Sequence, residues 1–411
     1  VAWVNVGGTE TTYDCEGGKW GLIDVKGEFL LDPLLSLSYV MNFFDGLAWI
    51  KEGSRRYADK WSLLNKNGRF IARSEFDFDE VHAFCGDHTI VEKEGKKGLV
   101  NRAGKIVVTP KYDSLSGFNE GFFWARTGAK KDPEGFLEGG KFGLLNLDGE
   151  LIKKPIYDDV KGFHEHLAWV QRKDKGGKWA LLNNQAIKLL NYKFEKVFRF
   201  YDGKAIVLLD SRWIQIDSRG KVTHQFPDHV EEIISFDGEL AIISMEGQYT
   251  FMDEKGKLCF SPVYEEIKNS DTAAWMRSAE GWQVFNKESR TLNCPNATFE
   301  SVHPFISGEA RIWSKGKFGL VNDEGKVLVE PQYGWVDHSR EGYIWVNVGG
   351  KHGYSGVRGG KFGVLDMNGN VVTKPMYDWM WDFMGEELIH VELRGKKGYA
   401  NRKGGLIWLE K

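Results

Sequence analysis

An acidic or amide side chain recurs at one fixed place along this chain of 411 residues, four positions after an aromatic or lysine anchor. The clearest copies read Lys, aromatic, Gly, two apolar residues, Asp or Asn, two variable residues and Gly, as in Lys141 to Gly149. Eleven copies align, with anchors at Trp20, Trp61, Lys97, Phe142, Trp179, Trp213, Tyr249, Trp282, Phe318, Phe362 and Lys397. Because the motif recurs along the whole sequence, it predicts one repeat array over residues 1–411 rather than several unrelated domains.

Each copy predicts a tight hairpin at its Asp or Asn. These positions are held by Asp24, Asn65, Asn101, Asn146, Asn183, Asp217, Asp253, Asn286, Asn322, Asp366 and Asn401. Three residues further on stands a Gly, except in the two copies where Ala186 and Ser289 replace it. The Asx side chain opens a turn, and Gly takes the left-handed backbone position that residues with a Cβ enter at a cost. We therefore expect each anchor strand to fold straight back on a second strand.

The second strand is apolar and often reaches a proline, as in Ile106 to Pro110. Because proline has no amide hydrogen, we expect the strand to end there. A Tyr segment follows, such as Tyr157 to Phe163, and the next unit opens with an apolar strand, such as Leu167 to Val170. The approximate units are 1–45, 46–86, 87–120, 121–165, 166–202, 203–237, 238–270, 271–307, 308–340, 341–385 and 386–411.

Burial on both faces is predicted for the anchor strand. The two residues after the motif glycine are usually both apolar, as in Leu144 and Leu145, whereas a half-exposed strand would alternate. The small residue after the anchor, such as Gly143, would let neighbouring backbones approach closely. The expected fold class is all-β: a tandem array of about eleven three- to four-stranded antiparallel units resembling β-propeller blades, with an open β-superhelix or solenoid as the alternative. The sequence does not decide between an array that closes into a ring and one that does not.

The charge balance argues against nucleic acid as the partner. The formal net charge is -3, so the sequence offers no basic surface to displace counterions from phosphates. No apolar run approaches the length needed to span a membrane. A soluble protein is expected, with the compartment open between the cytoplasm and export after removal of a signal peptide.

The Trp20-Gly21 pair, together with Phe-Gly pairs at 142, 318 and 362, resembles the WG-repeat family, a bacterial β-rich repeat. The similarity extends over nearly the whole chain. The resemblance implies a fold of repeated β-strands and an interaction role, and it supplies no catalytic residues.

Standard motifs for phosphate binding, zinc proteases and serine nucleophiles are absent, so no enzyme activity, cofactor or metal is expected. His164 and His166 flank Glu165 and could present two imidazoles to a metal, but a solvated loop is the preferred interpretation. A propeller-type hydrolase would need converging carboxylates. The pairs Asp158 with Asp159 and Asp77 with Asp79 are the only suggestive runs.

The preferred function is a non-catalytic scaffold for protein–protein interaction, with an unidentified protein as partner. Inserts at Arg55 to Lys60, Ala129 to Gly139 and His352 to Arg358 vary while the core stays fixed, and they are expected to be loops. A carbohydrate-binding module that uses exposed tryptophans, with a glycan as partner, is the alternative. Its candidate binding residues are Trp335, Trp379 and Trp381, for which core packing is the competing interpretation.

Overall fold

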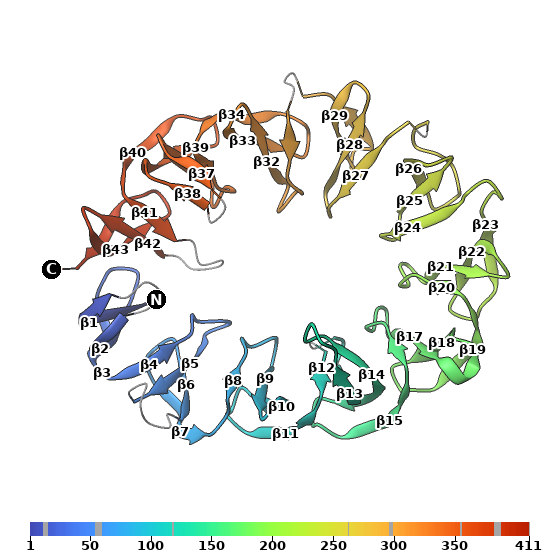
Figure 1. The fold of residues 1–411 in the computed structure, drawn as a ribbon, viewed down its shortest axis with the longest axis horizontal. Helices are drawn as coiled ribbons and strands as arrows, with labels where there is room; N and C mark the ends of the chain where they lie inside the picture. Colours follow the sequence, from blue (N-terminus) through green and yellow to red (C-terminus); the bar gives the residue numbers. More distant parts are fainter. Residues whose placement is uncertain are drawn as a thin grey trace. The chain divides into compact units, whose positions relative to one another are not determined.

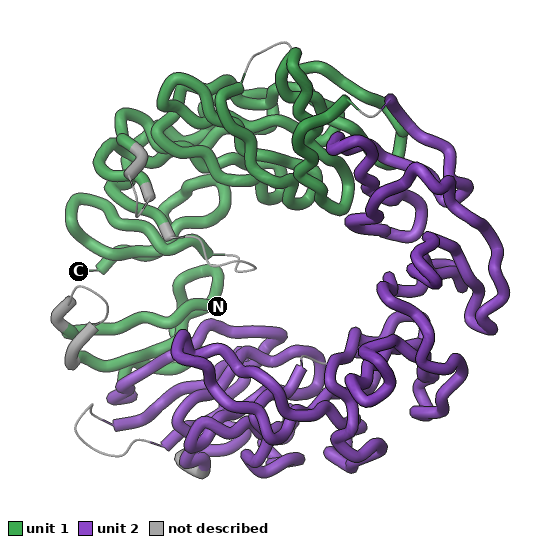
Figure 2. The backbone as a smooth tube through the Cα atoms, turned by 45° about the vertical axis from the view of Figure 1, so that its right-hand side comes forward, with its two compact units in different colours: residues 1–34, 262–411 green, residues 35–261 purple. Residues whose placement is uncertain are grey.

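The computed structural model describes residues 1–10, 15–53, 60–116, 119–261, 263–295, 299–353, 356–381 and 388–410. Over these residues the chain is all-β apart from one 3₁₀ turn, η1 (Lys173–Lys175). The strands form eleven antiparallel sheets of three or four strands and one two-stranded hairpin. None of the described residues lies in a helix long and apolar enough to cross a membrane. The chain divides into two compact units, residues 35–261 and residues 1–34 with 262–411 (Figure 2).

The unit of residues 35–261 contains the sheets that we number 2 to 7 in chain order (Figure 1). Strands that follow one another in sequence are hydrogen-bonded neighbours, so each sheet is a meander. Sheet 2 consists of β4 (Leu37–Val40), β5 (Leu47–Glu52), β6 (Trp61–Asn65) and β7 (Phe70–Phe76). Sheet 3 consists of β8 (Glu80–Val81), β9 (His88–Lys93), β10 (Lys96–Asn101) and β11 (Ile106–Tyr112). Sheet 4 consists of β12 (Ser114–Leu115), β13 (Phe122–Lys131), β14 (Leu137–Asn146) and β15 (Leu151–Tyr157). Sheet 5 consists of β16 (Asp159–Val160), β17 (Leu167–Arg172), β18 (Lys178–Asn183) and β19 (Lys188–Phe194). Sheet 6 consists of β20 (Lys196–Val197), β21 (Lys204–Leu209), β22 (Arg212–Asp217) and β23 (Val222–Gln225). Sheet 7 consists of β24 (Glu232–Phe236), β25 (Leu240–Met245) and β26 (Gln248–Asp253).

The other unit contains sheet 1 and sheets 8 to 11. Sheet 1 consists of β1 (Ala2–Glu10), β2 (Cys15–Ile23) and β3 (Phe29–Leu35). Sheet 8 consists of β27 (Glu266–Asn269), β28 (Ala273–Ser278), β29 (Gly281–Asn286) and β30 (Thr291–Asn293). Sheet 9 consists of β31 (Ser301–Val302), β32 (Glu309–Ser314), β33 (Lys317–Asn322) and β34 (Val327–Tyr333). Sheet 10 consists of β35 (Trp335–Val336), β36 (Tyr343–Val348), β39 (Lys361–Asp366) and β40 (Val371–Tyr377). The separate hairpin of β37 (Lys351–Gly353) and β38 (Gly356–Arg358) is inserted between β36 and β39. Sheet 11 consists of β41 (Trp379–Trp381), β42 (Leu388–Leu393), β43 (Lys396–Asn401) and β44 (Leu406–Leu409).

The predicted Asx hairpins are confirmed. In sheet 3, Asn101 Oδ1 accepts hydrogen bonds from the amides of Ala103 at 3.1 Å and Lys105 at 2.9 Å, and Gly104 has a φ of +76°. The side chain of every motif Asp or Asn accepts at least one such amide within its own turn. Ala186, which replaces the glycine in sheet 5, takes the left-handed conformation with a φ of +57°. The turn geometry therefore outweighs the steric cost of that Cβ.

The glycine after the anchor allows the last two strands of one sheet to approach closely. A Cβ on Gly143 would lie 2.7 Å from the carbonyl oxygen of Lys153 on β15, and the register of β14 with β15 shifts on both sides of Leu144. Gly98, Gly319 and Gly363 have equivalent close contacts with β11, β34 and β40. Close approach of backbones at this residue is confirmed for these four copies, but it occurs at a bulge between two strands of one sheet and not between stacked units.

The predicted strand ends at proline are wrong. β11 continues through Pro110 to Tyr112, and β15, β34 and β40 likewise continue through their prolines. These strands are the last of their sheets, and each proline lies in the bulged stretch between two ladder pairs, so its missing amide hydrogen removes no required ladder bond. The continued strand places Tyr157 opposite the anchor Phe142, and Tyr377 opposite Phe362.

Adjacent sheets stack face to face through aromatic side chains. In the unit of residues 35–261, Trp169 of β17 is 2% exposed and stacks on Phe200, which follows the first strand of sheet 6, with ring centroids 5.7 Å apart. The Trp169 indole also donates to the Phe198 carbonyl at 2.8 Å. The same stacking recurs for Trp49 with Phe84 and Trp124 with Phe163, and in the other unit for Trp275 with Phe305. The predicted burial of both sheet faces is therefore confirmed.

The first and last sheets contact each other within the unit of residues 1–34 and 262–411. Ala2, Val4 and Ile23 of sheet 1 form one buried cluster with Leu388 of sheet 11. The Tyr399 hydroxyl of β43 donates a hydrogen bond to the Trp3 carbonyl oxygen of β1. An apolar face of sheet 11 is thus covered by strands from the opposite end of the sequence.

Candidate functional site

The repeated motif residues hold the sheets together. The lysine before the anchor pairs with the carboxylate next to the tyrosine that opens the Tyr segment: Lys141 Nζ lies 2.6 Å from Asp158 Oδ1. The other oxygen of Asp158 accepts the Lys173 amide at 2.8 Å. Burial raises the pKa of Asp158, but the hydrogen bonds from Lys141 and Lys173 outweigh it and hold that pKa below its usual value. Lys96 with Asp113 and Lys361 with Asp378 repeat this pairing, so a site particular to this chain has to arise where the units differ.

The carboxylates suggested for a hydrolase also have local partners. Asp77 forms an ion pair with Lys93, and Asp79 Oδ2 accepts the Glu94 amide at 2.6 Å. Asp159 Oδ1 accepts the amide of the next residue at 2.8 Å. With Asp158 held as described, each of these side chains stabilises a turn or a strand pairing.

Sheet 9 carries the clearest departure from the aromatic stack. Arg311 occupies the position on β32 that Trp169 occupies on β17: its carbonyl oxygen accepts the His303 amide, as that of Trp169 accepts the Lys161 amide. The residue that corresponds to Phe200 is Ser339. An indole and a phenyl ring are therefore replaced by a guanidinium and a hydroxyl at the contact between sheets 9 and 10.

Polar neighbours partly compensate for this replacement. Glu309, only 7% exposed, accepts the Ser339 hydroxyl at 2.5 Å and the Ser339 amide at 2.7 Å. The Arg311 guanidinium lies 4.3 Å from the ring centroid of Trp335, which gives a cation–π contact. We call Glu309, Arg311, His338 and Ser339 the Glu309 cluster.

His338 is the titratable member of the Glu309 cluster that is least well satisfied. Neither of its ring nitrogens has a hydrogen-bond partner within the described ranges, and the same holds for Arg311 Nε. Burial, and next the positive charge of Arg311, lower the pKa of His338 below its usual value. The ring is therefore neutral near pH 7. Buried polar groups without partners cost stability, which marks the cluster as a candidate for a role other than packing.

The structure places the sequence-predicted residues Trp335 and Trp379 in one apolar cluster of sheets 10 and 11. Both are half-buried: Trp335 packs edge-on to Phe318 at 5.2 Å, and Trp379 packs edge-on to Phe362 at 6.0 Å. Trp381 is the last residue of β41, and its side chain lies outside the described part of the chain.

A pocket of about 380 Å³ lies between sheets 3 and 4, which the sequence interpretation missed. It is lined by two acidic and two basic residues among others, namely Asp87, His88, Asn101, Arg102, Ala103, Lys105, Val107, Leu147 and Asp148. Arg102 is already held by Asp45, whose carboxylate lies 2.6 Å from its guanidinium. Most of the lining comes from turns at the ends of strands, so the pocket depends on how two sheets stack and has no motif of its own.

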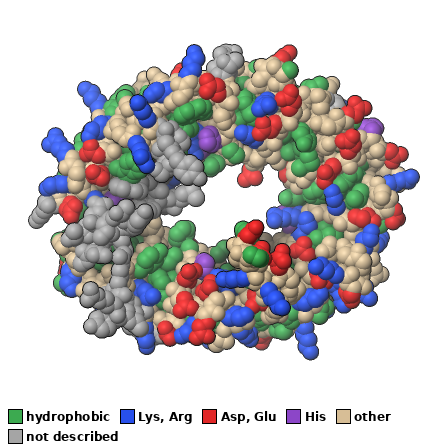
Figure 3. All heavy atoms as spheres, viewed as in Figure 1, with side chains coloured by type: hydrophobic (Ala, Val, Ile, Leu, Met, Phe, Trp, Pro, Cys, Tyr) green, Lys and Arg blue, Asp and Glu red, His purple; other side chains and the backbone are tan. Residues whose placement is uncertain are grey.

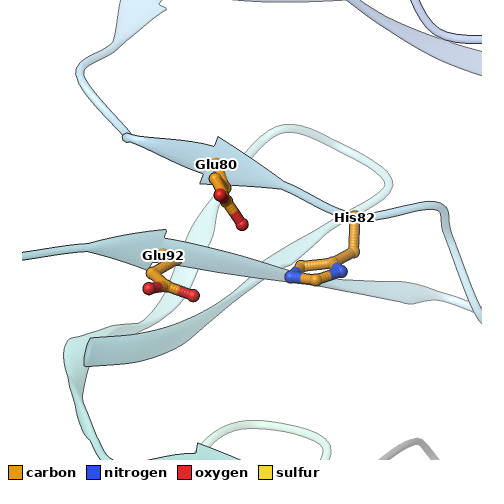
Figure 4. A group of neighbouring side chains, drawn as sticks. All are labelled: Glu80, His82 and Glu92. Carbon is orange, nitrogen blue, oxygen red and sulfur yellow. The ribbon is translucent and has the colours of Figure 1, made fainter. Parts of the chain in front are cut away.

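A second missed group lies on one face of sheet 3 (Figure 4). Glu80 on β8, His82 just after it and Glu92 on β9 place their potential ligand atoms within 4.8 Å of one another. The histidines that the sequence interpretation singled out behave differently. His164 and His166 lie in a tight turn, and the His166 amide donates to Glu120 at 2.8 Å.

Antiparallel meanders stacked face to face through aromatic side chains define the class of protein, an all-β repeat protein with β-propeller-like blades. Six segments match the family model of the WG containing repeat: residues 20–55, 98–130, 142–179, 188–213, 318–351 and 362–396. The protein belongs to the WG-repeat family, as the Trp-Gly and Phe-Gly pairs predicted. No curated protein sequence matches the chain.

Solved structures with some similarity include a eukaryotic initiation factor, at 11% identity and a TM-score of 0.44, covering 89% of this chain and 96% of that one. Kluyveromyces lactis Hsv2 follows at 9% identity and a TM-score of 0.32, covering 63% of this chain and 96% of that one. Dihydro-heme d1 dehydrogenase NirN matches at 12% identity and a TM-score of 0.33, covering 70% and 71%. At these identities and scores, the matches carry no argument about function.

Proposed function

We propose that this protein is a non-catalytic scaffold that binds another protein, with the end of the β13–β14 hairpin as the main contact. The observation that carries the proposal is Phe136, which is 68% exposed next to the turn of that hairpin. A large aromatic side chain in water, on a backbone already ordered, is the kind of anchor that a protein partner buries.

The insert from Ala129 to Gly139, expected as a loop, is a continuation of the ladder. Ala129 pairs with Gly139, Lys130 with Glu138 and Lys131 with Leu137. The turn repeats the Asx design of the core units: Asp132 Oδ1 accepts the amides of Glu134 at 2.9 Å and Phe136 at 2.8 Å. Because the hairpin is ordered before binding, complex formation costs little conformational entropy for ordering it.

The base of this hairpin is fixed to its sheet by polar side chains. Arg126 donates to the carbonyl oxygens of Gly139 at 2.7 Å and Leu137 at 3.0 Å. Asp113 accepts the Ala129 amide at 2.7 Å. Beyond these contacts, Lys130, Lys131 and Glu138 are exposed. The extension therefore adds surface for contact rather than core.

Charge also favours a protein partner. Acidic and basic side chains are interspersed on the face in view in Figure 3, in keeping with a net charge of -3. A phosphate backbone would require a basic surface, whereas a protein interface needs apolar anchors with a mixed polar surround.

A site-specific photo-crosslink tests the proposal. We expect p-benzoylphenylalanine in place of Phe136, in the full chain, to form an adduct with a distinct protein in extract of the source cells. The same group in place of Ile152, 40% exposed on β15 of the same sheet, is the matched control and should form none. Equal labelling from both positions, or no adduct from 136, would refute a binding role for the hairpin.

Glycan binding through Trp335, Trp379 and Trp381 is kept as a second proposal. Trp335 and Trp379 retain part of their surface in water, and half-buried aromatic rings can still offer an edge or face to a sugar. A glycan array comparing the wild-type chain with Trp379→Ala tests it, and an array with no wild-type signal would end it.

A further inference from the structure

Two carboxylates face each other directly on sheet 3. Glu80 of β8 and Glu92 of β9 are cross-strand partners in the register. His82 lies two residues after Glu80, so its side chain leaves the backbone on the same face. Like charges directly opposite on a sheet are destabilising, so this pair costs stability unless another charged group offsets the repulsion.

Corresponding pairs in other sheets avoid such repulsion. Glu266 faces Arg277 in sheet 8, with 3.6 Å between their charged groups, and Asp159 faces the neutral Gln171 in sheet 5. Among the described pairs at this position, sheet 3 alone opposes two carboxylates.

Lys97 relieves only part of this repulsion. It occupies the anchor position that other units fill mostly with aromatic rings, and its ammonium forms an ion pair with Glu92. The side chains of Glu80 and His82 have no hydrogen-bond or ion-pair partner in the portion of the chain that the structure describes. One carboxylate and one imidazole are therefore left facing Glu92.

We propose that Glu80, His82 and Glu92 bind a divalent transition metal ion of the zinc type. An imidazole nitrogen with two carboxylate oxygens suits this borderline class of ion better than Ca²⁺ or Mg²⁺, which prefer oxygen ligands alone. Tetrahedral zinc with bonds of roughly 2.0–2.2 Å holds its ligand atoms about 3.5 Å apart. The three groups lie within 4.8 Å of one another, so side-chain rotation on fixed strands closes the site.

The ion would take over the role of the Lys97 ammonium towards Glu92 and also neutralise Glu80. Three protein ligands leave a fourth position for water or for a side chain of a bound molecule. Glu80 and His82 are exposed, so this position faces solvent. The site goes beyond the proposed scaffold function and does not depend on the hairpin.

Titration of the tag-free full chain with Co²⁺ tests the site directly, followed by displacement with Zn²⁺. We expect visible d–d absorption at one Co²⁺ per chain, and at least about tenfold weaker binding for His82→Ala and for Glu80→Gln. His303→Ala is the matched control, because His303 follows the first strand of sheet 9 as His82 follows that of sheet 3, and it should bind as the wild type does. Absence of a one-to-one signal, or equal binding by all variants, would overturn the proposal.

Thermal melting supplies an independent measurement. Without metal, Glu80→Gln should melt at or above the wild-type temperature, because it removes the repulsion from Glu92. Saturating Zn²⁺ should raise the melting temperature of the wild type and leave that of Glu80→Gln nearly unchanged. A zinc-dependent rise of equal size in both proteins would contradict the assignment of Glu80 as a ligand.

Discussion

Sheet 5 and sheet 9 use the same backbone register for opposite chemistry. In sheet 5, Trp169 stacks on Phe200 and its indole is hydrogen-bonded. Arg311 of sheet 9 and Ser339 of sheet 10 hold the corresponding positions, and Glu309 accepts the serine hydroxyl. The repeat therefore fixes the backbone positions, while the side chains at one contact between sheets can change from apolar to polar if they change together.

The largest expected effect is on the apolar version of this contact. Trp169→Ala should lower the free energy of unfolding by about 3–5 kcal/mol, because it removes a buried ring and leaves a cavity. Urea denaturation, read by hydrogen exchange of β17 and β21, measures it. Trp282→Ala, at a half-buried anchor, is the control and should cost less. A loss below about 1 kcal/mol for Trp169→Ala would show that the stack is not what holds these sheets together.

Converting the polar contact into the apolar one should have the next largest effect. The triple substitution Glu309→Leu, Arg311→Trp and Ser339→Phe rebuilds, at the contact of sheets 9 and 10, the residues found at the contact of sheets 5 and 6. Replacing buried charged groups by packed apolar ones is expected to raise the free energy of unfolding by roughly 1–4 kcal/mol. Arg311→Ala alone should lower it. If the triple variant is less stable than the wild type, the two contacts are not interchangeable and the comparison fails.

A third test concerns the ion pair that sheet 5 has and sheet 10 lacks, since Gly334 stands where Asp158 stands. Asp158→Asn should cost roughly 1–2 kcal/mol, because it weakens charge-assisted hydrogen bonds from Lys141 and Lys173. The control is Asp159→Asn, whose exposed carboxylate caps only its own strand. Equal losses in urea denaturation would show that the pair adds nothing beyond the turn.

The smallest effect is the pH dependence of the Glu309 cluster. Because the pKa of His338 is lowered in the folded protein, the unfolded chain binds more protons between that value and about 6.5. The contribution of neutral His338 is complete above about pH 6.5 and is lost as the pH falls towards the folded pKa. Melting temperatures between about pH 7.5 and 5 should therefore fall more for the wild type than for His338→Gln. Parallel curves would contradict this.

The local parts of the fold could be predicted because each depends on a few adjacent residues. The Asx turn at Asn101 and Gly104 closes through the amides of its own turn. Burial of both faces follows from adjacent apolar residues such as Leu144 and Leu145. The strand end at Pro110 was wrong, because whether proline ends a strand depends on the bulge at Gly98 and on what lies beyond the last strand.

The candidate sites could not be predicted in the same way, because their residues meet only through register and stacking. Glu80 and Glu92 are opposed by the pairing of two strands, and Arg311 reaches its neighbours across two sheets. One signal was present in the sequence: aligning the units places Arg311 where several of them carry tryptophan. The pocket near His88 has no such signal.

The bulge and the proline in the last strands bear on how copies of the molecule behave in a crowded solution. These strands carry exposed apolar side chains, such as Ile106, 42% exposed, and Val371, 58% exposed. A flat strand edge of this composition would recruit a matching edge from another copy and grow into fibrils. The kinked backbone and the absent proline amide break that template, so we expect these edges to resist pairing with another copy although they carry exposed apolar side chains.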